Sequence, residues 1–441
     1  MMGKSDNTEL TKKARELLRK QVDRKLAAAL ETCVRCGICA ESCHYYVADP
    51  RPEHVPAYRA EKLRQIYRGL FDPIGRIAPG WVGAVPVSDQ MLDSLVETSF
   101  ASCTMCRRCT VNCPMGVDNA LVVRAIRSLV TATGRAPEML EQLAEAAIMR
   151  EEGLEYIKDL FLEQIAELEN ELREKVGDLK SRIPVEEQGA EILYVALSGA
   201  HTILPASVLF YATGTSWSLS LFEAANYGVF LGDTPRAKRI TQRIVDEATR
   251  LGVKEVVVSE CGHAYTTLRW EAPNWFGKPF PFRVRSLVEV MAEWIEKGKL
   301  KLDPTRNRLA VTYHDSCNLA RNSGLIEEPR TILNACVTDF REMTPNKQHN
   351  YCCGGGAGLV ALPEFSEQRL NAGKPKVKQI KATGASIVAA SCDNCRHQLG
   401  ELNEHYEMGV EVIGLAELVV NALVLDKGRV PGKEPVVAAT V

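Results

Sequence analysis

The sequence has no hydrophobic run long enough to cross a membrane. Its most apolar window, residues 203–212, is about half the ~20 residues that a membrane-spanning helix needs. The first twenty residues lack the apolar core of a secretory signal peptide and instead predict an amphipathic helix. We therefore expect a protein that is not itself embedded in a membrane, although it can still be the peripheral subunit of a membrane complex.

An excess of either charge is also lacking, because 54 Lys and Arg nearly balance 56 Asp and Glu. A net charge of −2 predicts no general field for binding nucleic acid or anionic lipid. Neither a Walker loop nor a GxGxxG motif after a strand is present, so nucleotide hydrolysis and a flavin site are not expected. What remains is an ordinary globular composition over 441 residues, enough for two or three domains.

Cysteine, by contrast, is abundant, with fifteen residues of which thirteen fall into regular patterns. Because the chain has no export signal, structural disulfides are not expected. Metal ligation or redox chemistry is therefore the prediction.

Eight of these cysteines form two CxxCxxCxxxC runs, at Cys33–Cys43 and Cys103–Cys113. Three cysteines on a tight loop can hold three irons of one cubane, and the fourth usually reaches the other cluster. A pair of zinc sites, the alternative, uses two CxxC pairs rather than triplets with a fourth cysteine. The runs predict one [4Fe–4S] cluster on Cys33, Cys36, Cys39 and Cys113, and another on Cys103, Cys106, Cys109 and Cys43. Cys113 is followed by Pro114, as the pattern expects, whereas Cys43 is followed by His44.

The periodicity of the chain divides it into a helical part and an α/β part. Residues 1–32 predict a helical arm, residues 33–135 an α-helical ferredoxin-like domain almost without strand signals, and residues 136–186 a helical linker. From residue 191 onward, short apolar runs alternate with helices, which predicts parallel βαβ units over residues 187–425. One of these runs is residues 227–233, and the tail at 426–441 is expected to be flexible.

The α/β part contains an internal repeat. Residues 251–268 and 383–399 share a helix end, a glycine turn, a buried strand, a serine and a cysteine loop. We align Tyr211–Gly214 with Tyr351–Gly354, so that Ala212 and Thr213 stand where the second copy has paired cysteines. The predicted fold class is thus a helical two-cluster domain followed by an α/β domain of two pseudo-repeats.

Five further cysteines fall in the second repeat, on three loops: Cys317, Cys352, Cys353, Cys392 and Cys395. Loops at the ends of parallel strands can bring such residues together, and the glycines after Cys353 let the backbone approach a bulky inorganic core. Five ligands exceed the needs of a cubane, which indicates an unusual cluster or a redox-active cysteine beside one. The alternative is a set of buried thiols, which is how we interpret the isolated Cys336.

Cys261 is the surviving cysteine of the first repeat, and His263 follows two residues later. It is either a vestigial packed thiol or a reactive thiol that faces the substrate across from the five-cysteine site. Under the second interpretation, Cys261, His263 and Cys353 are the predicted catalytic residues. His314 and His397 flank the predicted site, where we expect a supporting role around the ligands.

The C-x34-CCG-x37-CxxC pattern behind a two-cluster ferredoxin resembles the HdrD-type subunit of the heterodisulfide reductases, the CCG-domain family. The resemblance covers roughly residues 25–425. The stretch ETCVRCGICAESCHYYVADPRPEHVPAYRAEKLRQIYRG most closely resembles the DsrK-type subunits, to which TmcB and HmeD are related.

This resemblance implies a noncubane [4Fe–4S] cluster on the five cysteines, reduced one electron at a time through two cubanes. It also implies a haem b membrane subunit that exchanges with quinol, further complex subunits, a location on the cytoplasmic face of the inner membrane and no nucleic acid partner. In the family the site reduces a disulfide-like bond, and for the DsrK type the substrate is the trisulfide of the sulfur-carrier protein DsrC. The incomplete first repeat does not imply a second noncubane cluster.

Two other classes of function stay open at this point. One is an electron-conducting subunit of a quinone-linked flavoprotein dehydrogenase, of the glycerol-3-phosphate or glycolate type. The other is a redox-sensing scaffold without turnover.

Overall fold

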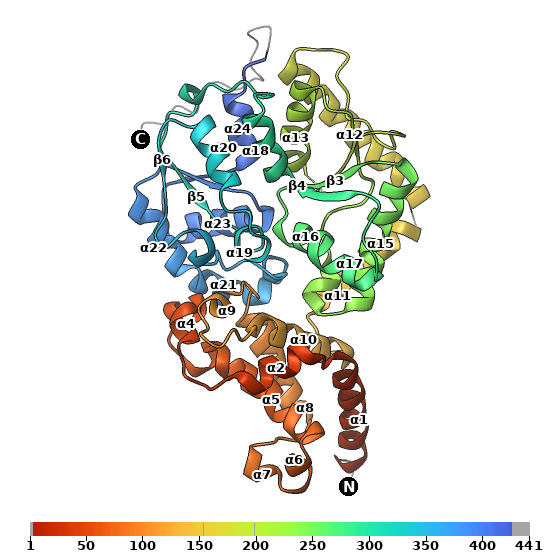
Figure 1. Cartoon of the computed structure of the whole chain (residues 1–441), viewed down its shortest axis with the longest axis vertical. Helices are drawn as coiled ribbons and strands as arrows, with labels where there is room; N and C mark the ends of the chain where they lie inside the picture. The colour runs from red at the N-terminus through yellow and green to blue at the C-terminus, as the bar shows by residue number, and fades with distance from the viewer. Residues whose placement is uncertain (1–2, 153, 198, 426–441) are drawn as a thin grey trace. The chain divides into compact units, whose positions relative to one another are not determined.

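A computed structural model describes residues 3–152, 154–197 and 199–425 (Figure 1). The tail at 426–441, predicted to be flexible, lies outside the described residues. The chain divides into two compact units that each combine distant segments. We call the first, residues 1–144, 227–234 and 351–377, the ferredoxin unit, and the remainder the α/β unit.

The ferredoxin unit is built around helix α10 (Asn119–Ala132), which Asp118 caps by accepting hydrogen bonds from the N–H groups of Ala120 (3.0 Å) and Leu121 (3.2 Å). Its described residues contain no strand. The other helices over the first 144 residues are α1 (Gly3–Gln21), α2 (Arg24–Thr32), α3 (Cys39–Ser42), α4 (His44–Ala48), α5 (Pro56–Phe71), α6 (Pro73–Ile77), α7 (Pro79–Val82), α8 (Asp89–Val96), α9 (Arg108–Val111) and the beginning of α11 (Glu138–Glu152). Helices α1, α2, α5 and α8 all pack against α10.

A buried arginine of α10 gathers the distant segments of this unit. The Arg127 guanidinium donates hydrogen bonds to the carbonyl oxygens of Ser99 (3.0 Å), Cys103 (3.1 Å), Phe230 (2.8 Å) and Ala357 (2.7 Å). A buried charge is tolerated only when its donors are satisfied, and these four acceptors meet that need. Arg127 thus fixes the cysteine loop at 103 to the segments around residues 230 and 357.

The segment at 227–234 forms helix α14 (Tyr227–Leu231), which packs on α10. Thr131 donates a hydrogen bond to the Leu231 carbonyl (2.8 Å). At Gly232, where φ is +70°, an added Cβ would lie 2.6 Å from the Arg124 carbonyl oxygen, so only glycine permits this approach. The prediction of a strand over residues 227–233 is wrong, because a short buried apolar run does not distinguish strand from helix.

The described part of the α/β unit contains two four-stranded parallel sheets with the same topology, β2-β1-β3-β4 and β6-β5-β7-β8. The strands are β1 (Ile192–Val195), β2 (Trp217–Leu219), β3 (Glu255–Val258), β4 (Arg283–Ser286), β5 (Val311–His314), β6 (Phe340–Arg341), β7 (Ile387–Ala390) and β8 (Glu411–Gly414). The central strands are buried along their length, as in sheets covered by helices on both faces. This repetition confirms the predicted fold class, a helical two-cluster domain followed by an α/β region of two pseudo-repeats.

The helices of this unit cover the sheets and join them. They are α12 (Leu154–Val176), α13 (Ala200–Thr213), α15 (Thr234–Leu251), α16 (Gly262–Thr266), α17 (Ala272–Phe276), α18 (Leu287–Glu296), α19 (Ala320–Ser323), α20 (Glu328–Cys336), α22 (Lys374–Thr383), α23 (Asp393–His405) and α24 (Leu415–Ala422). Helices α18, α20 and α24 pack on one another, and one hydrophobic core runs through both sheets. None of the described helices is both long enough and apolar enough to cross a bilayer.

The sheet topology corrects the alignment of the two repeats. Tyr211–Gly214 lies at the end of α13, before β2, whereas the segment Tyr351–Gly354 follows β6. The equivalent loop of the first repeat follows β2 and begins with Asn226-Tyr227, which matches Asn350-Tyr351. Gly228 and Val229, not Ala212 and Thr213, therefore stand where the second repeat has its paired cysteines. The error arose because a shared Tyr and Gly are weaker evidence than position in a strand order.

Candidate iron–sulfur sites

The first four-cysteine site lies in the ferredoxin unit. Cys33, Cys36, Cys39 and Cys113 line one cavity, so the fourth cysteine of the second run is placed with the first three of the first run. Between the cysteines, Arg35 (φ +57°) and Gly37 (φ +82°) adopt left-handed conformations that curl the loop. Four thiols around a small cavity are the donor set that a [4Fe–4S] cluster requires.

This first site is close to the surface. Cys36 is exposed, and exposed apolar side chains surround it, namely Val34, Ile38 and Met115. The neighbouring charge of Arg35 is paired with Glu61, with a nitrogen–oxygen distance of 2.9 Å. The surface around the first site is thus apolar with its nearby charge neutralised.

The second four-cysteine site is more enclosed. Cys43, Cys103, Cys106 and Cys109 line one cavity, and its loop repeats the left-handed positions of the first at Met105 (φ +50°) and Arg107 (φ +59°). The buried Arg59 donates a hydrogen bond to the Cys43 sulfur (3.3 Å). Burial works to raise the pKa of Cys43, but the Arg59 charge lowers it below its ordinary value. Arg59 is a supporting residue that the cysteine spacing did not reveal.

Three cysteines of the second repeat lie at one edge of the α/β unit. Cys317 follows β5, and Cys392 and Cys395 follow the adjacent strand β7. Cys392 is the N-cap residue of α23, and Cys395 lies in the first turn of that helix. The pKa of Cys392 is lowered mainly by a hydrogen bond from Cys395, with a further contribution from the Gly262 N–H. This edge, at the carboxyl ends of parallel strands, is where such sheets bind ligands.

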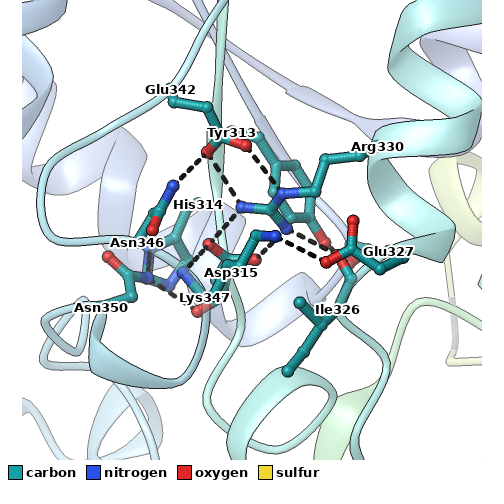
Figure 2. Close-up of polar contacts among 11 residues, drawn as sticks. Tyr313, His314, Asp315, Ile326, Glu327, Arg330, Glu342, Asn346, Lys347 and Asn350 are labelled. Carbon is teal, nitrogen blue, oxygen red and sulfur yellow. Dashed lines mark hydrogen bonds and ion pairs between the residues drawn. The ribbon is translucent and has the colours of Figure 1, made fainter.

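An ion-pair network fixes the strand end that leads to Cys317. The Arg330 guanidinium makes two hydrogen bonds to Asp315 (2.7 and 2.9 Å) and two to Glu342 (2.7 and 2.9 Å), as Figure 2 shows. The Asp315 carboxylate also accepts the backbone N–H of Lys347 (2.7 Å). The bidentate geometry holds the chain two residues before Cys317 against α20.

The two histidines expected around this site differ in position. His314 is buried at the end of β5, where its Nδ1 is 3.3 Å from the Asn350 amide and a ring nitrogen lies within 4.8 Å of the Cys395 sulfur. His397 instead points outward from α23 and pairs with Glu401 at 3.0 Å. Of the two, only His314 lies beside a cysteine in the described contacts.

Cys352 and Cys353 belong to the ferredoxin unit and are both buried. The Gly354 N–H lies 3.5 Å from the Cys352 sulfur, and the Gly355 N–H lies 3.5 Å from the Cys353 sulfur. The preceding Tyr351 ring stacks on the Arg108 guanidinium, 3.8 Å from the ring centre. The glycines after the paired cysteines therefore aim backbone donors at both sulfurs.

Cys261 and His263 lie in the α/β unit at the end of β3, as N-cap and early residue of α16. The backbone N–H of Asn226 donates to His263 Nε2 (3.3 Å), so this nitrogen carries no proton and the ring proton lies on Nδ1. Nδ1 is 3.4 Å from the Cys261 sulfur and donates to it. Burial lowers the pKa of His263 to about 4, which keeps the ring neutral. Burial raises the pKa of Cys261 well above its ordinary value, and the Cys392 sulfur contributes in the same direction.

Cys336 and the largest described cavity lie away from these cysteines. Cys336 is packed at the end of α20, and burial raises its pKa to about 12, as expected of a core thiol. The cavity, of about 390 Å³, is lined by α12 and by the segments that follow β1 and β2. It thus belongs to the cysteine-poor repeat, and only its rim residue Glu223 influences Cys261.

Comparison with known proteins matches both cysteine-rich regions. The family model of a 4Fe-4S dicluster domain matches residues 29–117, and that of a cysteine-rich domain matches residues 311–400. Iron-sulfur subunit 2 of the Hdr-like menaquinol oxidoreductase of Archaeoglobus fulgidus is 30% identical, over 91% of this chain and 81% of its own length. The chain belongs to the family of heterodisulfide-reductase-like iron–sulfur oxidoreductase subunits.

More distant relatives cover most of the chain. The dihydromethanophenazine:CoB–CoM heterodisulfide reductase of Methanosarcina barkeri has an HdrD-type subunit that is 24% identical, over 89% of this chain and 94% of its own length. The EtfAB:quinone oxidoreductase of Syntrophomonas wolfei is 24% identical, over 89% of this chain and 58% of its own length. The predicted heterodisulfide-reductase resemblance and the iron–sulfur content are confirmed. The narrower DsrK-type assignment stays a prediction.

Proposed function

We propose that this heterodisulfide-reductase-like subunit passes electrons between a quinol-reactive haem b membrane subunit and a five-cysteine site that reduces, or oxidises, a disulfide or trisulfide. The observation that carries the proposal is the position of Cys317, Cys392 and Cys395 at the carboxyl ends of adjacent strands. The substrate we propose is the trisulfide of a DsrC-like sulfur-carrier protein, as for the DsrK type.

The ligand sets are part of this proposal. One cubane is assigned to Cys33, Cys36, Cys39 and Cys113, a second to Cys43, Cys103, Cys106 and Cys109, and a noncubane cluster to Cys317, Cys352, Cys353, Cys392 and Cys395. Support comes from the two shared cavities and from the match of the cysteine-rich model to all five of the last set. Such clusters supply electrons singly, and iron can hold a substrate sulfur between the two electrons that a disulfide requires.

The protein's own groups account for orientation and protons. Reduction of a disulfide consumes two electrons and two protons and releases two thiols. His263 holds a proton on Nδ1 and directs it at the Cys261 sulfur, and Asn226 fixes this tautomer. Cys261 is buried near Cys392, where a thiol can hydrogen-bond to a departing sulfur. We therefore propose Cys261, His263 and Cys353 as the catalytic residues.

The proposed membrane partner has a suitable contact surface on this chain. The Archaeoglobus fulgidus relative is a subunit of a menaquinol oxidoreductase. Val34, Ile38 and Met115 form an exposed apolar ring around the first cysteine site. Because Arg35 is already paired with Glu61, a partner covering this ring has little charge to desolvate. We propose that electrons enter or leave here, with the chain peripheral on the cytoplasmic face of the inner membrane.

The decisive experiment combines spectroscopy with turnover on the purified anaerobic protein. Oxidised protein should show a paramagnetic signal that Cys353→Ala abolishes, while both cubane signals persist. A viologen donor alone should support consumption of a disulfide or trisulfide, and Cys353→Ala should remove this activity. Cys336→Ala, which removes a buried core thiol, is the matched control and should change neither. A signal that survives Cys353→Ala would refute the ligand assignment.

A second candidate function is electron conduction without sulfur chemistry, in a quinone-linked flavoprotein dehydrogenase. The similarity to an EtfAB:quinone oxidoreductase favours it. In that case the clusters would still be reduced by viologen, but no disulfide or trisulfide would be consumed. The same assay therefore separates the two functions.

A further inference from the structure

His44 occupies the position after Cys43, where the cysteine pattern usually has proline. It is buried as the first residue of α4. Its Nδ1 is 3.0 Å from the Ala372 carbonyl oxygen, and because a carbonyl only accepts, Nδ1 is the donor. Its Nε2 is 3.2 Å from the Thr104 hydroxyl. One imidazole thus connects the first cysteine run, the second run and the end of α21 (Ser366–Ala372), which follows the paired-cysteine loop.

The same ring lies between sulfurs that we assign to different clusters. A ring nitrogen of His44 and the sulfurs of Cys106 and Cys352 all lie within 4.8 Å of one another. The Thr104 hydroxyl is 3.4 Å from the Cys352 sulfur. All four residues belong to the ferredoxin unit. The shortest described link between a ligand of the second cubane and a ligand of the five-cysteine site therefore passes beside His44 and Thr104.

We propose that His44 and Thr104 form a hydrogen-bonded bridge that couples the second cubane to the five-cysteine cluster. One electron leaves the cubane on Cys43, Cys103, Cys106 and Cys109, and one electron is gained by the cluster that includes Cys352. No bond is made or broken in this step. The inference rests on the proposed function, since it requires a cluster at Cys352, and it identifies which cubane is the direct donor.

Two physical effects follow from this placement. Hydrogen-bond donors near a ligand sulfur stabilise the negative charge that reduction adds, so they raise the reduction potential of the cluster. The bridge is buried, and in a low-dielectric interior such a contact acts more strongly than in water. His44 and Thr104 are therefore positioning residues, and their removal should lower the potential of the five-cysteine cluster and slow its reduction.

The test uses full-length protein loaded with its clusters. His44→Asn keeps a short amide that can bond the Ala372 carbonyl but cannot reach Thr104. Thr104→Val removes the hydroxyl at nearly constant volume, and Thr104→Ser restores it. The control His54→Asn changes another buried histidine whose Nδ1 also faces a carbonyl, that of Asp49 (2.7 Å), and whose described contacts include no cysteine. The readouts are iron content, the redox titration of each paramagnetic signal, and freeze-quench kinetics after a pulse of one-electron reductant.

We expect His44→Asn and Thr104→Val to keep wild-type iron content and both cubane signals. Electron transfer to the five-cysteine cluster should slow at least tenfold. Its equilibrium constant should fall about tenfold, which corresponds to about 59 mV for a one-electron couple. Thr104→Ser and His54→Asn should behave like the wild type.

Unchanged kinetics and potentials in both His44→Asn and Thr104→Val would overturn the inference. Loss of iron in both variants would also overturn it, because the residues would then be required to bind a cluster. If the wild type itself shows no signal from a cluster at Cys352, the proposed function fails instead, and the two failures are distinguishable.

Discussion

Arg330 offers the sharpest test of how the cysteine loops are supported. We consider Arg330→Met, which keeps most of the side-chain volume and removes the cation between Asp315 and Glu342 (Figure 2). The side chain of Asp315 is 1% exposed and that of Arg330 is 7% exposed, so the pair is shielded from water. Without Arg330, the Asp315 carboxylate keeps the Lys347 N–H but loses its countercharge.

The expected cost follows from this burial. Removing one partner of a buried ion pair costs about 3–5 kcal/mol, because the other charge is left uncompensated. Glu342 is 36% exposed and regains water, so its contribution is small. Asp315→Asn in the same background removes the stranded charge and should recover a large part of the loss. This recovery distinguishes electrostatics from a packing defect.

Arg341→Met is the matched control, because Arg341 pairs with Asp339 in the same unit while both side chains are 42% exposed. It should cost at most about 1 kcal/mol. The assay is anaerobic pulse proteolysis in urea, which reports the unfolded fraction without requiring reversible loss of the clusters. If Arg330→Met is no more destabilising than Arg341→Met, or if Asp315→Asn adds to its cost, the reasoning is refuted.

Two further predictions concern a carboxyl group and a thiol. Burial raises the pKa of Glu247 to about 7 from an ordinary 4.5, so the folded state keeps a proton that the unfolded state has lost, and stability falls as pH rises from about 4.5 to 7. The shift amounts to about 3 kcal/mol; relative to the wild type, Glu247→Gln should gain up to this amount over that window in urea midpoints, and a difference that is constant with pH would contradict the assignment. Cys261→Ser should lower disulfide turnover roughly 100-fold with all cluster signals retained, the size expected for a participating group. Cys336→Ser should leave turnover unchanged, and equal behaviour of the two serine variants would make Cys261 a vestigial packed thiol.

The cysteine runs and the alternation of strands and helices could be predicted because both are local. A CxxCxxC loop is short enough for spacing alone to imply ligands for one cluster, and a buried parallel strand is an apolar run of four or five residues. The family resemblance rested on the same kind of feature, the spacing from Cys317 to Cys395. Local pattern was insufficient at residues 227–233, where burial against α10 selected a helix for an apolar run that equally suits a strand.

What only the tertiary structure decided depends on contacts between residues far apart in the chain. Arg127 binds carbonyls 103 and 230 residues away, and no spacing rule anticipates that. The sequence showed that His44 departs from the usual proline, but only packing placed it beside Cys352, more than 300 residues later. Likewise, the sequence named Cys261 and His263, whereas the proton on Nδ1 of His263 was assigned by a backbone N–H from Asn226. The sequence by itself determined which cysteines we assign as ligands, since that assignment depends on residue type and local spacing. The groups that bridge and orient them come from long-range packing, which no local pattern encodes.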